Sequence, residues 1–215
     1  MPFIVYFLAG KLFALIVGVY YFRYLSRPYK LVLYLIAIAS FCESYGYYIG
    51  EHLKERNLWI FNCYILIEVW LMGIAAIYLI NTNEIKKIFL GLLIISTVIW
   101  GINIATVSIY QFASISMVFG LAFLTIMFII VLFSNMLFND NILKQPVFWL
   151  SLSTILYCAC DIPYMGLHNY LSEHMPSLSF QLAFINSLLD IIRYPLVAIS
   201  FILLGRQKEV VIKTV

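Results

Sequence analysis

The sequence predicts an all-α integral membrane protein, built as a bundle of seven transmembrane helices. Its composition supports this class: 64% of the 215 residues are hydrophobic, 11% are charged, and the mean hydropathy is +1.00. Apolar stretches long enough to cross a bilayer as a helix, about 20 residues each, recur seven times along the chain. A soluble domain would carry roughly a quarter charged residues, so the composition excludes cytosolic enzymes and nucleic-acid-binding proteins, and the breaks between the stretches are too short for a soluble domain.

Each expected helix is bounded by turn-forming or charged residues. Because the breaks are short, we expect consecutive helices to pack as antiparallel neighbours. Pro146 stands at the expected start of the sixth helix, where its missing amide hydrogen loses no hydrogen bond. In chain order, the expected helices are 3–22, ended by Ser26, Arg27 and Pro28; 29–50, ended by Glu55, Arg56 and Asn57; 58–80, ended by Asn81, Thr82 and Asn83; 86–105; 113–137, ended by Asn139, Asp140 and Asn141; 146–166; and 180–204.

The distribution of lysine and arginine predicts the orientation in the membrane. One set of short links holds only Lys54 and Arg56, accompanied by acids, and the basic links of the other set are expected to stay in the cytoplasm. The N-terminus is then outside and the C-terminus cytoplasmic, in a multi-pass protein of a bacterial inner (plasma) membrane. Residues 1–205 form the transmembrane domain, and 206–215 form a short basic cytoplasmic tail. The basic links contain Arg23, Arg27, Lys30, Lys86, Lys87, Lys144, Arg206, Lys208 and Lys213.

Six ionisable residues interrupt the expected helices: Lys11, Glu43, Glu68, Asp161, Asp190 and Arg193. A charge at mid-helix raises the free energy of insertion by roughly 2.5–3.5 kcal/mol, so such a residue usually faces a partner or an aqueous cavity. Three- and four-residue spacing places each acid on a helix face with other polar or aromatic side chains. We therefore expect one outward-opening polar cavity. Its expected ligand-binding residues are Glu68, Asp190, Glu43, Asp161, Tyr64, Tyr157 and Asn186.

The four acids outnumber the two bases in this expected cavity. In a low-dielectric interior, protons or a bound cation must offset the excess negative charge. Asp190 and Arg193 are one helical turn apart, which predicts a structural ion pair, the alternative being direct contact with a ligand. Lys11 is expected to pair with Glu43 or Glu68 on another helix. Glu68 is the deepest acid without a charged neighbour on its own helix, so it ranks first as a ligand-binding residue.

Two histidines, His52 and His168, each end a hydrophobic-Gly-x-His pattern near the expected outer ends of helices two and six. Each follows an acid by about two helical turns, Glu43 and Asp161 respectively. Histidine beside a carboxylate can bind Zn²⁺. A metal site at His52 and His168 would favour an intramembrane hydrolase. The alternative is that both histidines lie at the membrane interface without a metal.

The acids also suggest an internal repeat. Helices one to three and five to seven run in the same direction, and each triplet carries an acid in the outer half of its second helix and near the middle of its third. This pattern resembles the three-plus-one-plus-three parallel repeat of small sugar and vitamin carriers; parallel repeats with a midplane binding site are a known transporter design. The chain lacks the proline-glutamine motif of that superfamily and has Gln145-Pro146 instead. The resemblance therefore implies an architecture and no particular residue.

Several functions are compatible with these patterns. The first is binding or transport of a small polar or cationic solute, engaged by Glu68 and Asp190. The second is a membrane sensor or accessory subunit acting through a separate membrane or cytoplasmic protein, because the chain is similar in size and helix count to the membrane input regions of some bacterial sensor kinases. The intramembrane hydrolase and a purely structural subunit remain as alternatives. The sequence identifies no cofactor; the expected partners are the lipid bilayer and a small-molecule ligand.

Overall fold

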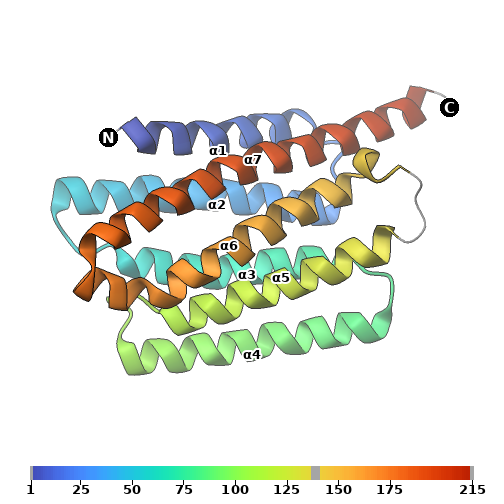
Figure 1. Ribbon diagram of the computed structural model, residues 1–215. Helices are drawn as coiled ribbons and strands as arrows, with labels where there is room; N and C mark the ends of the chain where they lie inside the picture. The colour runs from blue at the N-terminus through green and yellow to red at the C-terminus, as the bar shows by residue number, and fades with distance from the viewer. Residues whose placement is uncertain (1, 137–140, 214–215) are drawn as a thin grey trace.

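A computed structural model gives the fold and describes residues 2–136 and 141–213, with side chains except those of 2–7, 136, 186 and 210–213. Within these residues, seven α-helices run alternately from one end of the bundle to the other (Figure 1). The all-α prediction is confirmed. The elements are α1 (Pro2–Tyr20), α2 (Arg27–Tyr48), the π-helix η1 (Ile49–Leu53), α3 (Leu58–Leu79), α4 (Asn83–Val107), α5 (Ser114–Met136), the 3-10 helix η2 (Ile142–Lys144), α6 (Pro146–His174) and α7 (Pro176–Lys213).

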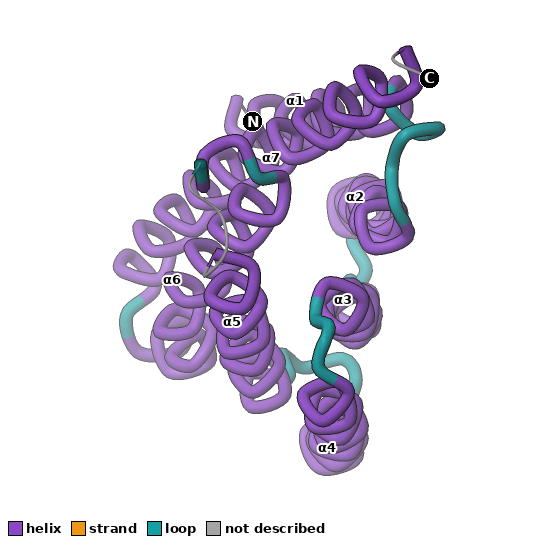
Figure 2. The backbone as a smooth tube through the Cα atoms, turned by 90° about the vertical axis from the view of Figure 1, so that its right-hand side faces the viewer, coloured by secondary structure: helices purple, strands orange, loops and turns teal. Residues whose placement is uncertain are grey.

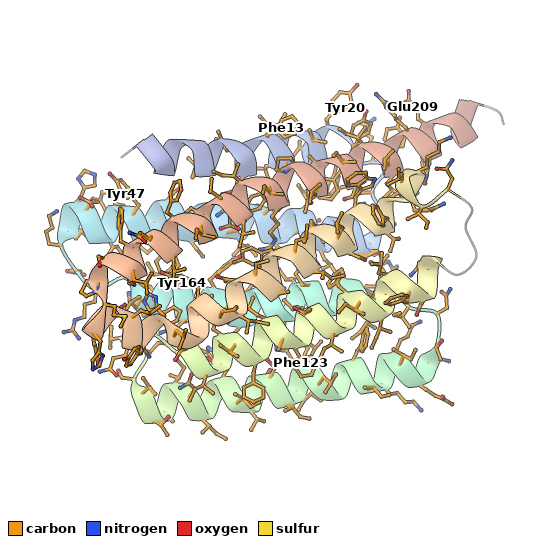
Figure 3. All side chains as sticks on the ribbon, viewed as in Figure 1. Phe13, Tyr20, Tyr47, Phe123, Tyr164 and Glu209 are labelled. Carbon is orange, nitrogen blue, oxygen red and sulfur yellow. The ribbon has the colours of Figure 1, made fainter. Side chains whose placement is uncertain are left out.

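Six of these helices, α2 to α7, are long and apolar enough to cross a membrane. In α1 the described apolar stretch is shorter, from Leu8 to Tyr20. Large apolar side chains face away from the bundle, such as Phe13 and Tyr20 on α1, which are 51% and 78% exposed (Figure 3). An apolar outer surface of this extent is typical of contact with lipid. The chain is therefore a multi-pass membrane protein.

The last two helices are longer than expected. The sequence predicts ends at 166 and 204, but α6 continues to His174 and α7 to Lys213. Residues 206–213, expected as a separate tail, thus extend α7. Pro163 and Pro195 lie inside these helices, and neighbouring helices in a membrane can satisfy the backbone groups that proline frees. Of the break expected at Asn139, Asp140 and Asn141, residues 139 and 140 lie outside the described residues.

Six helices form a closed ring around the bundle axis, in the order α1, α2, α3, α5, α6, α7. Each packs against its two neighbours, and α7 closes the ring on α1. Helix α4 lies outside this ring, against α3 and α5, as the view along the helices shows (Figure 2). In this order α3 and α7 occupy opposite positions, so a contact between their side chains crosses the interior of the ring.

The apolar core concentrates in the half of the bundle that contains the basic links. Fully buried side chains there include Phe89, Phe128, Leu150 and Phe201, all 0% exposed. They come from α4, α5, α6 and α7, so four helices share one densely packed region. This packing holds the helices at one end and leaves room for a polar interior toward the other end.

One buried side chain, Asn62 on α3, fastens the link between α4 and α5. Its Nδ2 donates hydrogen bonds to the carbonyl oxygens of Ile109 and Gln111, at 2.8 and 2.7 Å. Its Oδ1 accepts a hydrogen bond from the amide of Ala113 at 3.2 Å, and the Trp100 indole donates to the Asn62 carbonyl at 2.9 Å. Asn62 is 1% exposed. The side-chain amide of Asn62 therefore forms the hydrogen bonds that these backbone groups of the link would otherwise form with other backbone groups.

We expect Asn62→Leu to destabilise the protein by about 2 kcal/mol, because buried backbone groups of the α4–α5 link would lose their partners. The measurement is the midpoint of thermal unfolding of the purified protein in detergent. The control is Asn81→Leu, an exposed position between α3 and α4, which should leave the midpoint unchanged. Equal effects of both substitutions would contradict a fastening role for Asn62.

Candidate functional site

A cavity of about 470 Å³ lies inside the ring, in the half that contains the α2–α3 and α6–α7 links. Glu68 and Asp190 are its deepest lining acids, and Leu58, Phe112 and His168 line it toward the α2–α3, α4–α5 and α6–α7 links. The last three also line an adjoining hollow of about 520 Å³ at the loops, so they mark the mouth of the cavity. Small-molecule sites in proteins occupy about 300–1,000 Å³, and this cavity falls in that range.

Helical spacing explains how the lining residues face the interior. Tyr64 and Glu68 are one turn apart on α3, and Tyr157 and Tyr164 are two turns apart on α6. Tyr164 lies in the half of the bundle that contains the cavity (Figure 3). Among the residues expected to bind a ligand, the structure places five along the cavity wall. They are Glu43, Tyr64, Glu68, Tyr157 and Asp190.

Two other expected ligand-binding residues are not placed in the cavity wall. Asp161 on α6 is fully buried but is not among the residues that line the cavity. The side chain of Asn186 lies outside the described residues. Conversely, the charge pattern did not point to Phe112 and Met117, which come from the α4–α5 link and from α5 and also line the cavity. Both are apolar, and only the packing of α5 beside α3 brings them there.

A buried ion pair crosses the ring. Arg193 Nη2 on α7 donates a hydrogen bond to Glu68 Oε1 on α3 at 2.7 Å, and the two side chains are 6% and 5% exposed. The sequence predicted a pair between Arg193 and Asp190, and the cation considered for Glu68 was Lys11. The structure differs because residue spacing along one helix shows only which side chains share a face of that helix. Spacing carries no information about which charged residue of another helix lies opposite.

The Arg193 guanidinium also stacks on an aromatic ring. Its Cζ lies 4.0 Å from the ring centroid of Tyr157 on α6 and 6.0 Å from that of Tyr194. A cation over the face of an aromatic ring is stabilised by about 2 kcal/mol or more when both are desolvated. Arg193 therefore links α7 both to α3, through the carboxylate, and to α6, through the ring.

A second ion pair joins neighbouring helices. Lys11 on α1 is 1% exposed and donates from Nζ to Glu43 Oε1 on α2. The same Nζ lies 5.1 Å from the ring centroid of Tyr194. Of the two partners considered for Lys11 from the sequence, the structure pairs it with Glu43 rather than Glu68. Glu43 Oε2 has no hydrogen-bond partner among the described residues.

These two pairs leave two acids without a cation of their own among the described residues, Asp161 and Asp190. Neither carboxylate oxygen of Asp161 accepts a hydrogen bond from a described residue, nor does Oδ1 of Asp190. Asp161 is 0% and Asp190 is 7% exposed. Since an unpaired buried carboxylate is costly, these positions favour uptake of a proton or a cation. Asp190 is therefore a cavity-lining acid without an ion pair among the described residues, whereas Glu68, which the sequence ranked first, lines the cavity and is paired with Arg193.

The structure does not bring the two histidines into a metal site. His52 is exposed in η1 and its ring centroid lies 5.3 Å from that of Tyr48. His168 lies within α6, which continues past its expected end, and its ring centroid is 4.3 Å from that of Phe112 and 5.4 Å from that of Tyr164. In the part of the chain that the structure describes, no three His, Cys, Asp or Glu side chains are grouped so that they could hold a metal ion.

We expect Arg193→Met to lower the stability by about 3–5 kcal/mol, because Glu68 would become an uncompensated buried charge. The double variant Glu68→Gln with Arg193→Met should recover part of this loss, since no lone charge remains. Thermal unfolding in detergent measures both. The control is Arg206→Met, an exposed arginine later in α7. A double variant no more stable than Arg193→Met alone would show that the two charges are not coupled.

The residues that line this cavity determine its chemical character. Its lining combines carboxylates, tyrosines and apolar side chains, and its two internal cations are already paired with Glu43 and Glu68. The net character of the cavity is therefore acidic. No protein-family model, curated protein or solved structure matches the chain.

Proposed function

We propose that this protein binds a small polar or cationic solute in the outward-facing cavity and functions in its recognition or transport. The observation that carries the proposal is Asp190. Asp190 is 7% exposed and lines the cavity, and neither oxygen of its carboxylate accepts a hydrogen bond from a described residue. A cationic group in the cavity would supply both the charge and the hydrogen bond that this position lacks.

The outward orientation rests on the distribution of basic residues. The cavity lies at the end that contains the α2–α3 and α6–α7 links, where Lys54 and Arg56 are the basic residues of the α2–α3 region. The opposite end contains the α1–α2 and α3–α4 links and the end of α7, which are rich in lysine and arginine. Because basic links stay in the cytoplasm, this orientation opens the cavity to the outside.

The order of the ring supports transport on a three-plus-one-plus-three plan. Helices α1 to α3 form one arc and α5 to α7 the other, with α4 outside both arcs. The two seams of the ring, α3 with α5 and α7 with α1, would be equivalent under a two-fold relation between the arcs. The pair of Glu68 and Arg193 lies between the arcs. Two halves that meet around a central site are the arrangement in which one half can rock against the other.

A sensor acting through a partner is the second candidate, and the course of α7 favours it. This helix carries Asp190 and Arg193 in the interior and then continues to Lys213. Near that end, Gln207 Nε2 donates a hydrogen bond to the Lys144 carbonyl at 2.9 Å. A solute that shifts Asp190 would act on the helix that reaches the basic end of the bundle. No observation on the described residues favours the hydrolase.

We expect cationic solutes to stabilise the purified protein and neutral or anionic solutes of similar size to have no effect. Ethanolammonium, ethylene glycol and glycolate are suitable first members of the three classes. A solute at 100 times its Kd adds about 2.7 kcal/mol to the stability, which thermal unfolding detects. Asp190→Asn should remove the effect, whereas Glu55→Gln, at an exposed acid of the same end, should retain it. A cation that stabilises the wild type and Asp190→Asn equally would contradict the proposal.

A further inference from the structure

The charges of the residues that line the cavity favour a ligand with one positive charge. Three acids line it, Glu43, Glu68 and Asp190. Lys11 pairs with the first and Arg193 with the second, so one carboxylate remains to be neutralised. Charge complementarity in a buried site disfavours a ligand with more charge than the site can balance. A monovalent cation fits this lining better than a dication does.

The size and the donor set of the cavity select a polyatomic cation. Its volume of about 470 Å³ is far larger than the ~30 Å³ that one water molecule takes up in the liquid. Among the described residues, no three His, Cys, Asp or Glu side chains are placed to coordinate a metal ion. The Asp190 carboxylate instead lines the cavity, and neither of its oxygens accepts a hydrogen bond from a described residue. A protonated amine brings N–H donors to such an oxygen, whereas a quaternary ammonium ion brings none.

The other residues that line the cavity favour a ligand with an apolar or aromatic part. The rings of Phe61, Tyr64, Phe112 and Tyr164 line the cavity, and aromatic faces attract ammonium groups. Further lining residues, such as Met117, are apolar. A ligand made only of polar groups would leave its hydrogen-bonding groups unsatisfied against these walls. A ligand with an apolar part would bury that part here.

Two cationic side chains of the interior, Arg193 and Lys11, each contact both a carboxylate and an aromatic ring. The Arg193 guanidinium lies 4.0 Å from the Tyr157 ring centroid while it binds Glu68, and the Lys11 ammonium lies 5.1 Å from the Tyr194 ring centroid while it binds Glu43. Each cation is thus held by a carboxylate and an aromatic ring together. Asp190, with tyrosines in the same lining, offers the same two elements and forms no ion pair with a described residue.

We propose that the cavity is a site for a protonated primary or secondary monoamine with an apolar or aromatic body, whose ammonium group binds Asp190 while its body lies among Phe61, Phe112 and Tyr164. This inference rests on the proposed function and narrows it from cationic solutes to one chemical class. It requires both parts of the ligand: the charged N–H donors for the carboxylate and the body for the walls.

Three probes test the two parts separately on the wild-type protein in detergent or nanodiscs, by isothermal titration calorimetry at neutral pH. Phenethylammonium has both parts, 2-phenylethanol has the body without the charge, and methylammonium has the charge without the body. We expect phenethylammonium to bind at least tenfold more tightly than either of the others, which corresponds to about 1.4 kcal/mol. Equal binding of 2-phenylethanol would overturn recognition of the ammonium group, and equal binding of methylammonium would overturn the role of the walls.

Two variants test whether phenethylammonium binds in the cavity. Asp190→Asn should remove the preference for phenethylammonium over 2-phenylethanol, and Tyr164→Leu should weaken phenethylammonium roughly 2- to 30-fold. Glu55→Gln is the control and should change neither. A preference that persists in Asp190→Asn would overturn the assignment. If Asp190→Asn does not fold, the comparison of the three probes on the wild type still decides the ligand class.

The outcomes separate this inference from the function on which it rests. If another cation, such as guanidinium, binds in an Asp190-dependent way and phenethylammonium does not bind, the cavity is a cation site but the amine class is wrong. If neither phenethylammonium nor any other cation binds in an Asp190-dependent way, the inference and the proposed function both fail.

Discussion

The hydrogen-bonded ion pair of Glu68 and Arg193 is the interaction on which the interior depends. It connects α3 and α7, which stand opposite each other in the ring, and so fixes the width of the interior. Glu68 lines the large cavity, whereas Arg193 lines a space of only about 10 Å³ beside Met72 and Val197. The pair is therefore the inner boundary of the cavity. Beyond it the helices pack on apolar side chains.

This pair also determines which acid can act on a solute. Arg193 is held by Glu68 and by the ring of Tyr157 at once, and it forms no ion pair with Asp190. Asp190 is therefore a buried carboxylate one helical turn from Arg193, while Arg193 neutralises Glu68. Of the three acids that line the cavity, two form structural ion pairs and the third, Asp190, is the one that we propose to bind a solute. A cavity that is both stable and attractive to cations requires this division, because an excess charge is tolerated only where the other charges are paired.

The sequence was sufficient for the helices and for the general character of the interior. Long apolar stretches predict helices whatever their partners are, and the rarity of charge in a membrane singles out acids such as Glu68 and Asp190. Their pairing could not be predicted, because a helix face does not reveal which residue stands across the ring. The extension of α6 past residue 166 and the fastening role of Asn62 were missed for a similar reason. Both depend on neighbouring segments that are distant in the sequence.

In the proposed function, the cavity opens to the outside and Asp190 makes it acidic. The most direct test places a cysteine at Ser187, which lines the cavity one turn before Asp190, and compares two membrane-impermeant methanethiosulfonates applied to intact cells. We expect the cationic trimethylammonium-ethyl reagent to modify Ser187→Cys at least tenfold faster than the anionic sulfonatoethyl reagent, relative to a free thiol, with the preference lost on adding Asp190→Asn. No modification from outside, or a preference unchanged by Asp190→Asn, would contradict the account.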